Sequence, residues 1–185
     1  MQAVKAVEPH CRLAVMAKYP HQAELAKQKG ADEIIFTREG YPGVARLTGA
    51  QYFRSNLGVE NLVGGFDLIY DTIGTSRTLT DCLRWARASG AVVLVGVEFK
   101  PMRVDLTPVW YQEVDVIGIL GHGREWWEGQ PIDTFALVVQ WLREKRLNFD
   151  GYISARYPLR EYRRALAFAA DKRNKVIKVV LEPNG

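Results

Sequence analysis

The alternation of hydrophobic and polar positions is clearest between residues 66 and 97, where it predicts a strand, a helix and a second strand. Residues 67–73 form a short apolar run with a polar end, and residues 91–95 are continuous and rich in valine, as expected of a parallel strand covered on both faces. We expect Ser89 and Gly90 to end the intervening helix, because glycine adopts the left-handed conformation of a helix C-cap without strain. The helix itself is predicted by apolar residues at the i, i+3, i+4 and i+7 spacing of one face, namely Leu79, Cys82, Leu83 and Ala86.

The short joints of this strand–helix–strand unit predict a right-handed crossover between two parallel strands. Ligands of such sheets bind at the carboxyl ends of the strands. Those ends are residues 71–74 and residues 95–97. The pattern therefore predicts a binding edge formed by these two segments.

Similar patterns predict further helices and strands along the rest of the chain. Residues 37–65 are predicted to be irregular apart from a short helix near residues 44–47, and loops are predicted at residues 98–111 and after Gly121. The repeated alternation of strand and helix predicts an α/β fold with a mostly parallel sheet. The remaining predicted elements are a helix tail at 1–7, strands at 12–17, 33–36, 114–120, 152–157 and 175–181, and helices at 20–30, 131–145 and 159–170; in the helix at 131–145, Phe135, Val138, Val139 and Leu142 form one face.

Composition narrows the class of protein. The chain has 185 residues, a length that suits one domain or one domain with a small appendage. Its content of 48% hydrophobic and 25% charged residues is typical of an ordinary soluble globular protein. A solvated basic surface accounts for the net charge of +4 more simply than a nucleic-acid partner, and no apolar run is long enough to span a membrane. The only cysteines, Cys11 and Cys82, are far apart, which favours a reducing cytoplasm over a disulfide framework. The histidines, His10, His21 and His122, lack metal-ligand spacing.

Several segments, in this order, resemble a known family: AKYPHQAELAKQKGADEII, GGFDLIYDTIG, GAVVLVGV, VDLTPVWYQEVDVIG and ISARYPLREYRRALAFAADKRNKVIKVVL. Together they resemble the C-terminal, coenzyme-binding half of a zinc-dependent medium-chain dehydrogenase/reductase, of the alcohol and threonine dehydrogenase-like group. The resemblance implies a Rossmann-like, doubly wound sheet and hydride transfer between NAD(P) and an alcohol or carbonyl. It also implies a partial NAD(P)-binding domain at residues 1–150 and, at 151–185, a strand–helix–strand segment that returns to the catalytic domain.

Two family features are not found in the sequence. The motif G-x-G-x-x-G, which places the pyrophosphate at a helix N-terminus, does not occur, so we expect a truncated sheet without its first strand and glycine-rich turn. The family's zinc ligands lie upstream of the matching region; accordingly we assign no catalytic and no metal-ligating residue and expect this chain alone to be inactive. We expect the gap in the sheet to be repaired, either by pairing of its second and fourth strands, by an N-terminal strand, or by a strand from a neighbouring chain.

The resemblance assigns coenzyme contacts residue by residue. Ala17, Lys18 and Tyr19 match the position at which the family binds the adenosine ribose; a neutral residue followed by a cation slightly favours NADP over NAD, although Lys18 is equally well explained as a solvated surface residue. Lys178 matches a pyrophosphate-binding position or simply points outward from the last strand. The remaining matches are Thr72 and Ile73, which line the adenine or are an ordinary strand end, Val95, Gly96 and Val97, which form a nicotinamide shelf, and Ile119 and Gly121, which form its second edge.

Other interpretations stay open. The chain could be a non-catalytic nucleotide-binding or dimerisation module, because family members form homodimers through the edge strand that matches residues 114–120, where Ile117 and Leu120 would otherwise be exposed. A methyltransferase is a third possibility, since FDLIYD resembles that class's fourth strand, but Ala17 stands where that class needs an acid. His122 is a candidate acid–base group, although no neighbour in the sequence would fix or tune it.

Overall fold

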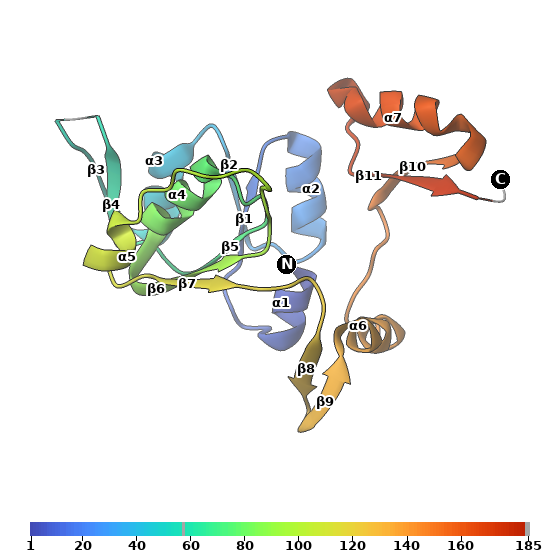
Figure 1. The fold of residues 1–185 in the computed structure, drawn as a ribbon, viewed down its shortest axis with the longest axis horizontal. Helices are drawn as coiled ribbons and strands as arrows, with labels where there is room; N and C mark the ends of the chain where they lie inside the picture. Colours follow the sequence, from blue (N-terminus) through green and yellow to red (C-terminus); the bar gives the residue numbers. More distant parts are fainter. Residues whose placement is uncertain (57, 184–185) are drawn as a thin grey trace. The chain divides into compact units, whose positions relative to one another are not determined.

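The computed structural model describes residues 1–56 and 58–183 (Figure 1). The chain divides into two compact units. One unit comprises Met1–Thr37 and Ala136–Gly185, and the other comprises Arg38–Phe135. The predicted boundary at residue 150 concerns the domains of a whole enzyme and stays a prediction; the last two residues of its C-terminal segment lie outside the described residues. No described helix is long and apolar enough to cross a membrane.

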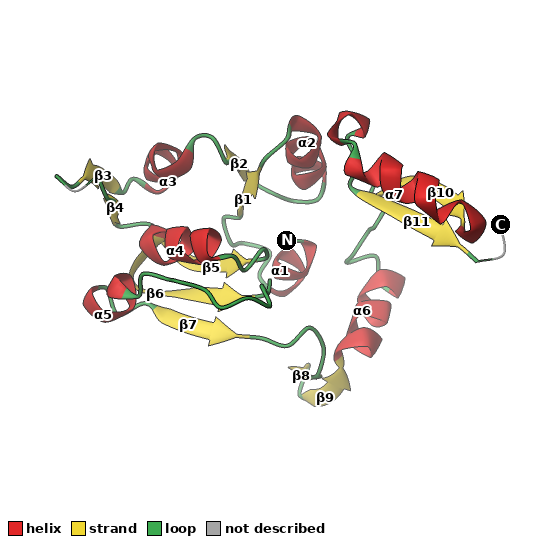
Figure 2. Ribbon diagram, turned by 45° about the horizontal axis from the view of Figure 1, so that its top comes forward, coloured by secondary structure: helices red, strands yellow, loops and turns green. Residues whose placement is uncertain are grey.

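The Arg38–Phe135 unit is built on a parallel three-stranded sheet in the order β5 (Phe66–Asp71), β6 (Ala86–Leu94) and β7 (Asp115–Gly118). Helix α4 (Ser76–Trp85) connects β5 to β6 and lies along the sheet (Figure 2). The parallel pairing and the connecting helix confirm the predicted strand–helix–strand unit and the α/β fold class. One apolar cluster joins the helix to the sheet: Leu79, Cys82, Leu83, Ala86, Val92 and Val114.

The predicted end of α4 is wrong. The helix ends at Trp85, and β6 begins at Ala86 and runs through Ser89 and Gly90. Ser89, rather than Gly90, has a positive φ, of 54°. A Cβ at Gly90 would lie 3.1 Å from the carbonyl oxygens of Phe66 and Asp67. The carbonyl oxygen of Arg87, in β6 itself, would lie nearer still, at 2.9 Å, so Gly90 is explained by close main-chain contacts within β6 and with β5, not by a helix cap.

Two antiparallel hairpins replace segments that were predicted to be irregular. Helix α3 (Gly40–Thr48) contains the predicted short helix, and it is followed by the hairpin of β3 (Gln51–Arg54) and β4 (Glu60–Val63). The second hairpin, β8 (Arg124–Trp127) with β9 (Gln130–Asp133), occupies the loop predicted after Gly121. A short helix, α5 (Thr107–Tyr111), ends the loop predicted at residues 98–111. All four residues of β3 are exposed, so no alternation of polar and apolar positions marks that strand.

A polar cluster attaches the segment before α5 to helix α4. The guanidinium of Arg84 forms an ion pair with Asp105 and donates to the carbonyl oxygen of Glu60 at 3.0 Å. Asp105 also accepts hydrogen bonds from the backbone N–H and the hydroxyl of Thr107. The hydrogen bonds from Thr107 and from Arg84 lower the pKa of Asp105 to about 2. Asp105 thus anchors this segment most firmly when it is ionised.

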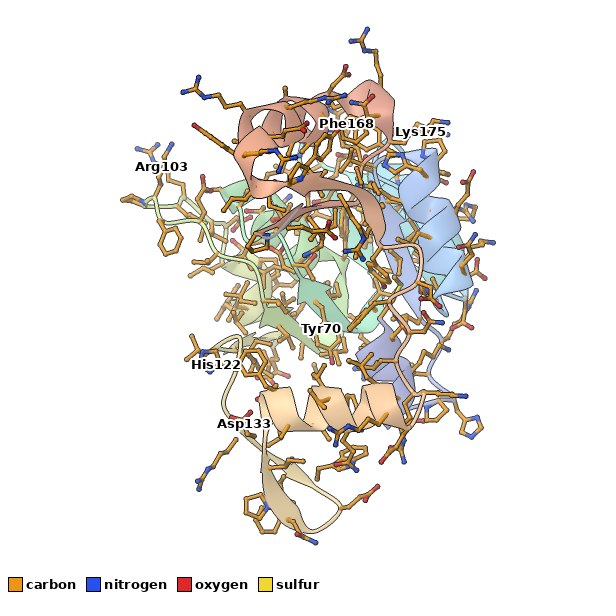
Figure 3. The ribbon with its side chains drawn as sticks, turned by 90° about the vertical axis from the view of Figure 1, so that its right-hand side faces the viewer. Tyr70, Arg103, His122, Asp133, Phe168 and Lys175 are labelled. Atoms are coloured by element: carbon orange, nitrogen blue, oxygen red, sulfur yellow. The ribbon has the colours of Figure 1, made fainter. Side chains whose placement is uncertain are left out.

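The other unit contains two separate pairs of parallel strands. Strands β1 (Ala14–Ala17) and β2 (Glu33–Phe36) pair in parallel and are connected by α2 (Pro20–Gln28). Strands β10 (Ile153–Pro158) and β11 (Lys178–Glu182) pair in parallel. Helix α7 (Tyr162–Ala170), which contains Phe168, lies between them in sequence (Figure 3). Short 3₁₀ turns, η1 (Leu159–Glu161) and η2 (Lys172–Asn174), flank α7. These elements confirm the predicted strands and helices to within a few residues.

Helix α6 (Thr134–Arg143) buries a different face from the one predicted. Its buried residues are Leu137 and Trp141, whereas Phe135, Val139 and Leu142 are exposed. The sequence of this helix is apolar on nearly all sides, so periodicity does not distinguish the two faces. The predicted helix also begins too early, because its first residues belong to β9.

Of the two repairs predicted within the chain, the N-terminal strand does not occur among the described residues, whereas pairing of the second and fourth strands would join the two units and stays a prediction. Residues Gln2–Val7 form a helix, α1, rather than a strand. Strand β1, which matches the family's second strand, pairs with β2, and β5, which matches the fourth, pairs with β6. The alanine- and lysine-containing sequence QAVKAV suits a helix, so α1 confirms the helix tail predicted at residues 1–7 and excludes the alternative of a strand there. A strand from a neighbouring chain stays a prediction.

Candidate functional site

The carboxyl ends of three neighbouring parallel strands meet at one edge of the β5–β6–β7 sheet (Figure 2). Ile73, just after β5, is 60% exposed, and Val97, after β6, is 66% exposed. The structure therefore gathers at this edge seven residues expected to bind coenzyme, and most of their side chains are open to solvent. These residues are Thr72, Ile73, Val95, Gly96, Val97, Ile119 and Gly121.

The tips of β5 and β6 touch through their backbones. A Cβ at Gly96 would lie 2.4 Å from the carbonyl carbon of Ile73, and a Cβ at Gly74 would lie 2.3 Å from the carbonyl oxygen of Gly96. Gly74 has a φ of 74°, which side chains rarely permit. Glycine at both positions thus allows the main chain itself, rather than side chains, to form the surface between the two tips.

Asp71 lies beneath this contact; it is the first residue of the predicted binding edge at residues 71–74, although the resemblance assigns it no coenzyme contact. Its side chain is 3% exposed, and Oδ1 accepts hydrogen bonds from the backbone N–H groups of Ile73 and Gly74, both at 3.0 Å. Oδ2 accepts a hydrogen bond from the hydroxyl of Thr78 at 2.9 Å. A sequence signal exists, because an acid at the end of an apolar strand and before a glycine turn commonly caps the following backbone.

Thr75 and Thr78 begin helix α4 next to this turn. The hydroxyl of Thr75 accepts from the backbone N–H of Thr78 at 3.2 Å, and the hydroxyl of Thr78 accepts from the backbone N–H of Thr75 at 3.0 Å. This reciprocal arrangement satisfies two backbone donors at the helix N-terminus. The strand tip, the turn and the first turn of the helix are consequently joined by one set of hydrogen bonds.

The other predicted contacts belong to the unit that contains β1 and β11. Ala17 is the buried last residue of β1, and Lys18 is exposed with its Nζ 5.6 Å from the centre of the Tyr19 ring. The ring of Tyr19 stacks on that of His21, with 5.6 Å between their centres. Lys18, Tyr19 and His21 therefore form a cationic and aromatic surface at the start of α2.

Two other predicted groups have simple surroundings. Lys178 is an exposed residue at the start of β11, where it pairs in register with Ile153 of β10. His122 is exposed after β7 (Figure 3). Its ring lies 5.5 Å from that of Phe135. An apolar ring neighbour offers no hydrogen bond that would orient the imidazole for proton transfer.

The described residues do not fit a zinc ion. Within residues 1–56 and 58–183, histidine, cysteine, aspartate and glutamate nowhere gather in a group of three or more. Both cysteines are free, and burial raises the pKa of the Cys82 thiol to about 12. A buried, protonated thiol is a poor metal ligand, because zinc binds the thiolate.

A hollow of about 500 Å³ lies in the Met1–Thr37 and Ala136–Gly185 unit, lined partly by Lys5, Lys29 and Arg146. Lys5 Nζ lies 2.6 Å from Asp32 Oδ2 and 2.6 Å from the Cys11 carbonyl oxygen, and Arg146 pairs with Glu144 at 2.8 Å. The hydrogen bond from Lys5 and the hydrogen bond from the backbone N–H of Leu13 lower the pKa of Asp32. Because two of its cations are already paired, this hollow is better explained as a structural junction than as an anion site.

Comparison with known proteins places the chain among dehydrogenases. A family model described as zinc-binding dehydrogenase matches residues 1–137. L-idonate 5-dehydrogenase of Vitis vinifera is 28% identical over 137 residues, which cover 72% of this chain and 32% of that protein. The chain thus spans about a third of the length of this curated relative.

Solved structures share the fold. A short chain alcohol dehydrogenase from Escherichia coli CFT073, complexed with NADH, has a TM-score of 0.70 at 18% identity, over 97% of this chain and 47% of that one. A zinc-binding dehydrogenase from Sinorhizobium meliloti 1021, bound to NADP, has a TM-score of 0.66 at 19% identity, over 92% and 44%. These matches confirm the Rossmann-like fold predicted from the sequence.

Proposed function

The chain belongs to the zinc-binding dehydrogenase family, and from that premise we propose that it is the coenzyme-binding portion of an NAD(P)-dependent, alcohol dehydrogenase-like oxidoreductase. The family membership confirms the resemblance found in the sequence. The whole protein would transfer a hydride between NAD(P) and a small alcohol or carbonyl compound. Because the chain covers only part of its relatives, this activity and its substrate are included in the proposal.

The observation that best supports this proposal is the edge formed by the tips of β5, β6 and β7. In open parallel sheets, ligands bind outside the carboxyl ends of the strands. The backbone contact between Gly74 and Gly96 leaves a surface of main-chain groups, with the exposed Ile73 and Val97 beside it. Such a surface suits a flat, amide-bearing ring, because backbone groups supply hydrogen bonds and the apolar side chains supply contact area.

When bound, NAD(P) would supply the hydride chemistry. Within the Arg38–Phe135 unit, the residues that would hold and orient it are Thr72 and Ile73 at the adenine and Val95–Val97, Ile119 and Gly121 at the nicotinamide. The pyrophosphate contact of Lys178, which lies in the other unit, stays a prediction from the resemblance alone. We assign no catalytic residue. Since the described donor groups do not fit zinc, we expect purified protein to hold no stoichiometric zinc and to lack alcohol-dependent reduction of NAD(P); one tightly bound zinc per chain with such activity would contradict this assignment.

The surroundings of Lys18 favour NADP over NAD in this proposal. No carboxylate stands at Ala17 to repel a 2′-phosphate, and Lys18 is exposed in the adjoining turn. A hydrogen bond to a charged group contributes about 1.5–3 kcal/mol, and solvent exposure reduces this considerably. We therefore expect about a tenfold preference for NADPH, equivalent to about 1.4 kcal/mol.

Titration of the chain with NADPH, NADH and S-adenosylmethionine tests the proposed function. We expect both nicotinamide coenzymes to bind and S-adenosylmethionine not to bind. Lys18→Ala should remove the preference for NADPH, whereas Lys27→Ala, at an exposed position of α2, should leave it unchanged. Binding of S-adenosylmethionine alone would instead support the methyltransferase interpretation.

A dimerisation module is the second candidate, and the β7 edge favours it. Strand β7 pairs with β6 on one side only among the described residues, and Leu120 beyond its end is 84% exposed. Exposed apolar strand edges tend to pair with other chains. We propose a homodimer through residues 114–120, compatible with coenzyme binding, and a cytoplasmic location in keeping with the free thiols Cys11 and Cys82.

A further inference from the structure

One residue holds both of the strand tips that form the proposed coenzyme edge. The carboxylate of Asp71 accepts from the backbone N–H groups of Ile73 and Gly74, and its main-chain oxygen accepts from those of Val95 and Gly96, at 3.0 and 2.9 Å. We propose that Asp71 is the positioning residue of this edge: it sets the conformation of both tips without touching the coenzyme. This inference rests on the proposed function, because it names what orders the same site.

The burial and charge of Asp71 make this role specific. Its side chain is 3% exposed, and the donors described around its two oxygens are neutral: two N–H groups and the Thr78 hydroxyl. A buried carboxylate needs several hydrogen bonds to offset its lost hydration. Both side-chain oxygens of Asp71 are consequently satisfied by the strand tip, its turn and the first turn of α4.

The order imposed by Asp71 extends to the second tip and to helix α4. Because Gly74 lies against the Gly96 carbonyl, a displaced β5 tip would displace the β6 tip. The hydrogen bond from the Thr78 hydroxyl to Asp71 Oδ2 also joins the first turn of α4 to the β5 tip. Residues proposed to contact the adenine and the nicotinamide are thereby oriented together.

A positioning role predicts which binding constants change. Both coenzymes share the edge at β5 and β6, whereas the 2′-phosphate is proposed to meet Lys18. Asp71→Asn should therefore weaken NADH and NADPH by the same factor, about tenfold, and leave their ratio unchanged. Asp67→Asn is the matched control, because Asp67 lies on the same strand with its side chain 85% exposed and paired with Arg87. That variant should bind both coenzymes as wild type does.

Amide hydrogen exchange separates positioning from general stability and needs no ligand. In Asp71→Asn, the N–H groups of Ile73 and Gly74 should exchange faster, while those of the core strand around Val92 remain protected. Val92→Ala, which removes buried side-chain volume instead, should lower the urea midpoint without this local change. If Asp71→Asn fails to fold, the same two measurements are made on Thr78→Val, which removes the bond to Oδ2 together with the bond that the Thr78 hydroxyl accepts from the Thr75 N–H. Thr78→Ser keeps the hydroxyl and should behave as wild type in both measurements.

The outcomes distinguish the two proposals. Failure of the wild-type chain to bind either coenzyme would refute the proposed function and, with it, the positioning of coenzyme by Asp71. This would hold even if the N–H groups of Ile73 and Gly74 exchanged faster in Asp71→Asn. Wild-type binding together with unchanged coenzyme affinity in folded Asp71→Asn would overturn the positioning role alone. So would a changed NADPH-to-NADH ratio, or a loss of affinity no greater than in Val92→Ala variants of equal stability.

Discussion

The contact between the β5 and β6 tips makes a sharp prediction for the substitution Gly96→Ala. The new methyl group would lie 2.4 Å from the Ile73 carbonyl carbon and 2.5 Å from the Ile73 nitrogen and the Thr72 carbonyl carbon. These are main-chain atoms, so no side-chain rotation relieves the overlap. Ordinary carbon contacts are about 3.5–4.0 Å, and the tips would therefore separate by about 1 Å or more.

Overpacking of this kind costs about 1–3 kcal/mol. Separation of the tips would also stretch the hydrogen bonds from Val95 and Gly96 to the Asp71 carbonyl oxygen, now 3.0 and 2.9 Å, each contributing about 1 kcal/mol. We expect the free energy of unfolding of the Arg38–Phe135 unit to fall by about 3–5 kcal/mol if both hydrogen bonds are lost, which is the sum of these contributions. The affinity for NADPH should fall as well, because Gly96 lies in the proposed nicotinamide shelf.

Urea unfolding followed by tryptophan fluorescence measures this change. Four of the five tryptophans lie in the Arg38–Phe135 unit, so the signal reports mainly on it. The control is Gly118→Ala at the end of β7, where a Cβ would meet nothing within 4 Å and φ is not positive. That variant should be neutral or stabilised by up to about 1 kcal/mol. Equal stability of the two variants would refute the close contact between the tips.

Three further predictions concern acid stability, thiol reactivity and assembly. The pKa of Asp105, about 2, lies below its unfolded value of about 3.9, so its contribution to stability is full above about pH 4 and is lost between about pH 4 and 2. Asp105→Asn should therefore reduce the fall of the urea midpoint over this pH range, and an unchanged fall would contradict the ion pair. At pH 8 a thiol reagent should modify the half-exposed Cys11 quickly and Cys82, whose pKa burial raises to about 12, only on unfolding; equal rates would contradict its burial. Leu120→Lys should convert the proposed dimer to a monomer in light scattering, whereas Phe99→Lys, at an exposed position outside the β7 edge, should not; a dimer that survives Leu120→Lys would argue against this interface.

Local periodicity was enough to predict the elements that bury an apolar face. The stripe through Leu79 and Leu83 and the valine-rich run of β6 are each specified by short-range spacing, and the structure confirms them. The hairpins β3–β4 and β8–β9 lack such a signal, because their strands are short and most of their residues are exposed. Their pairing depends on contacts between strands that periodicity does not encode.

The errors at Gly90 and in α6 have the same origin. Gly90 predicts a helix cap, but its surroundings are the carbonyl groups of Arg87 and, from the neighbouring strand β5, of Phe66 and Asp67, and the latter two are distant in sequence. In α6, both faces are apolar, and packing elsewhere in the unit selects Leu137 and Trp141. In each case tertiary contact outweighed the local preference.

The candidate site was predictable in position but not in construction. The carboxyl ends of parallel strands indicated the edge, and the resemblance assigned Thr72, Ile73 and the segment Val95–Val97 to it. The backbone contact between Gly74 and Gly96 and the bonds of Asp71 depend on the register of β5 against β6. That register follows from the folded sheet, so neither feature could be derived from spacing along the chain.

The central claim is that the tips of β5 and β6 form a nicotinamide coenzyme site. The most direct test is a titration of NADPH into the ¹⁵N-labelled chain, followed through the backbone amide resonances. We predict saturable shifts concentrated at residues 72–74 and 95–97, with S-adenosylmethionine producing none. Saturable NADPH binding that leaves these amides unchanged, or the absence of any binding at millimolar coenzyme, would contradict the claim.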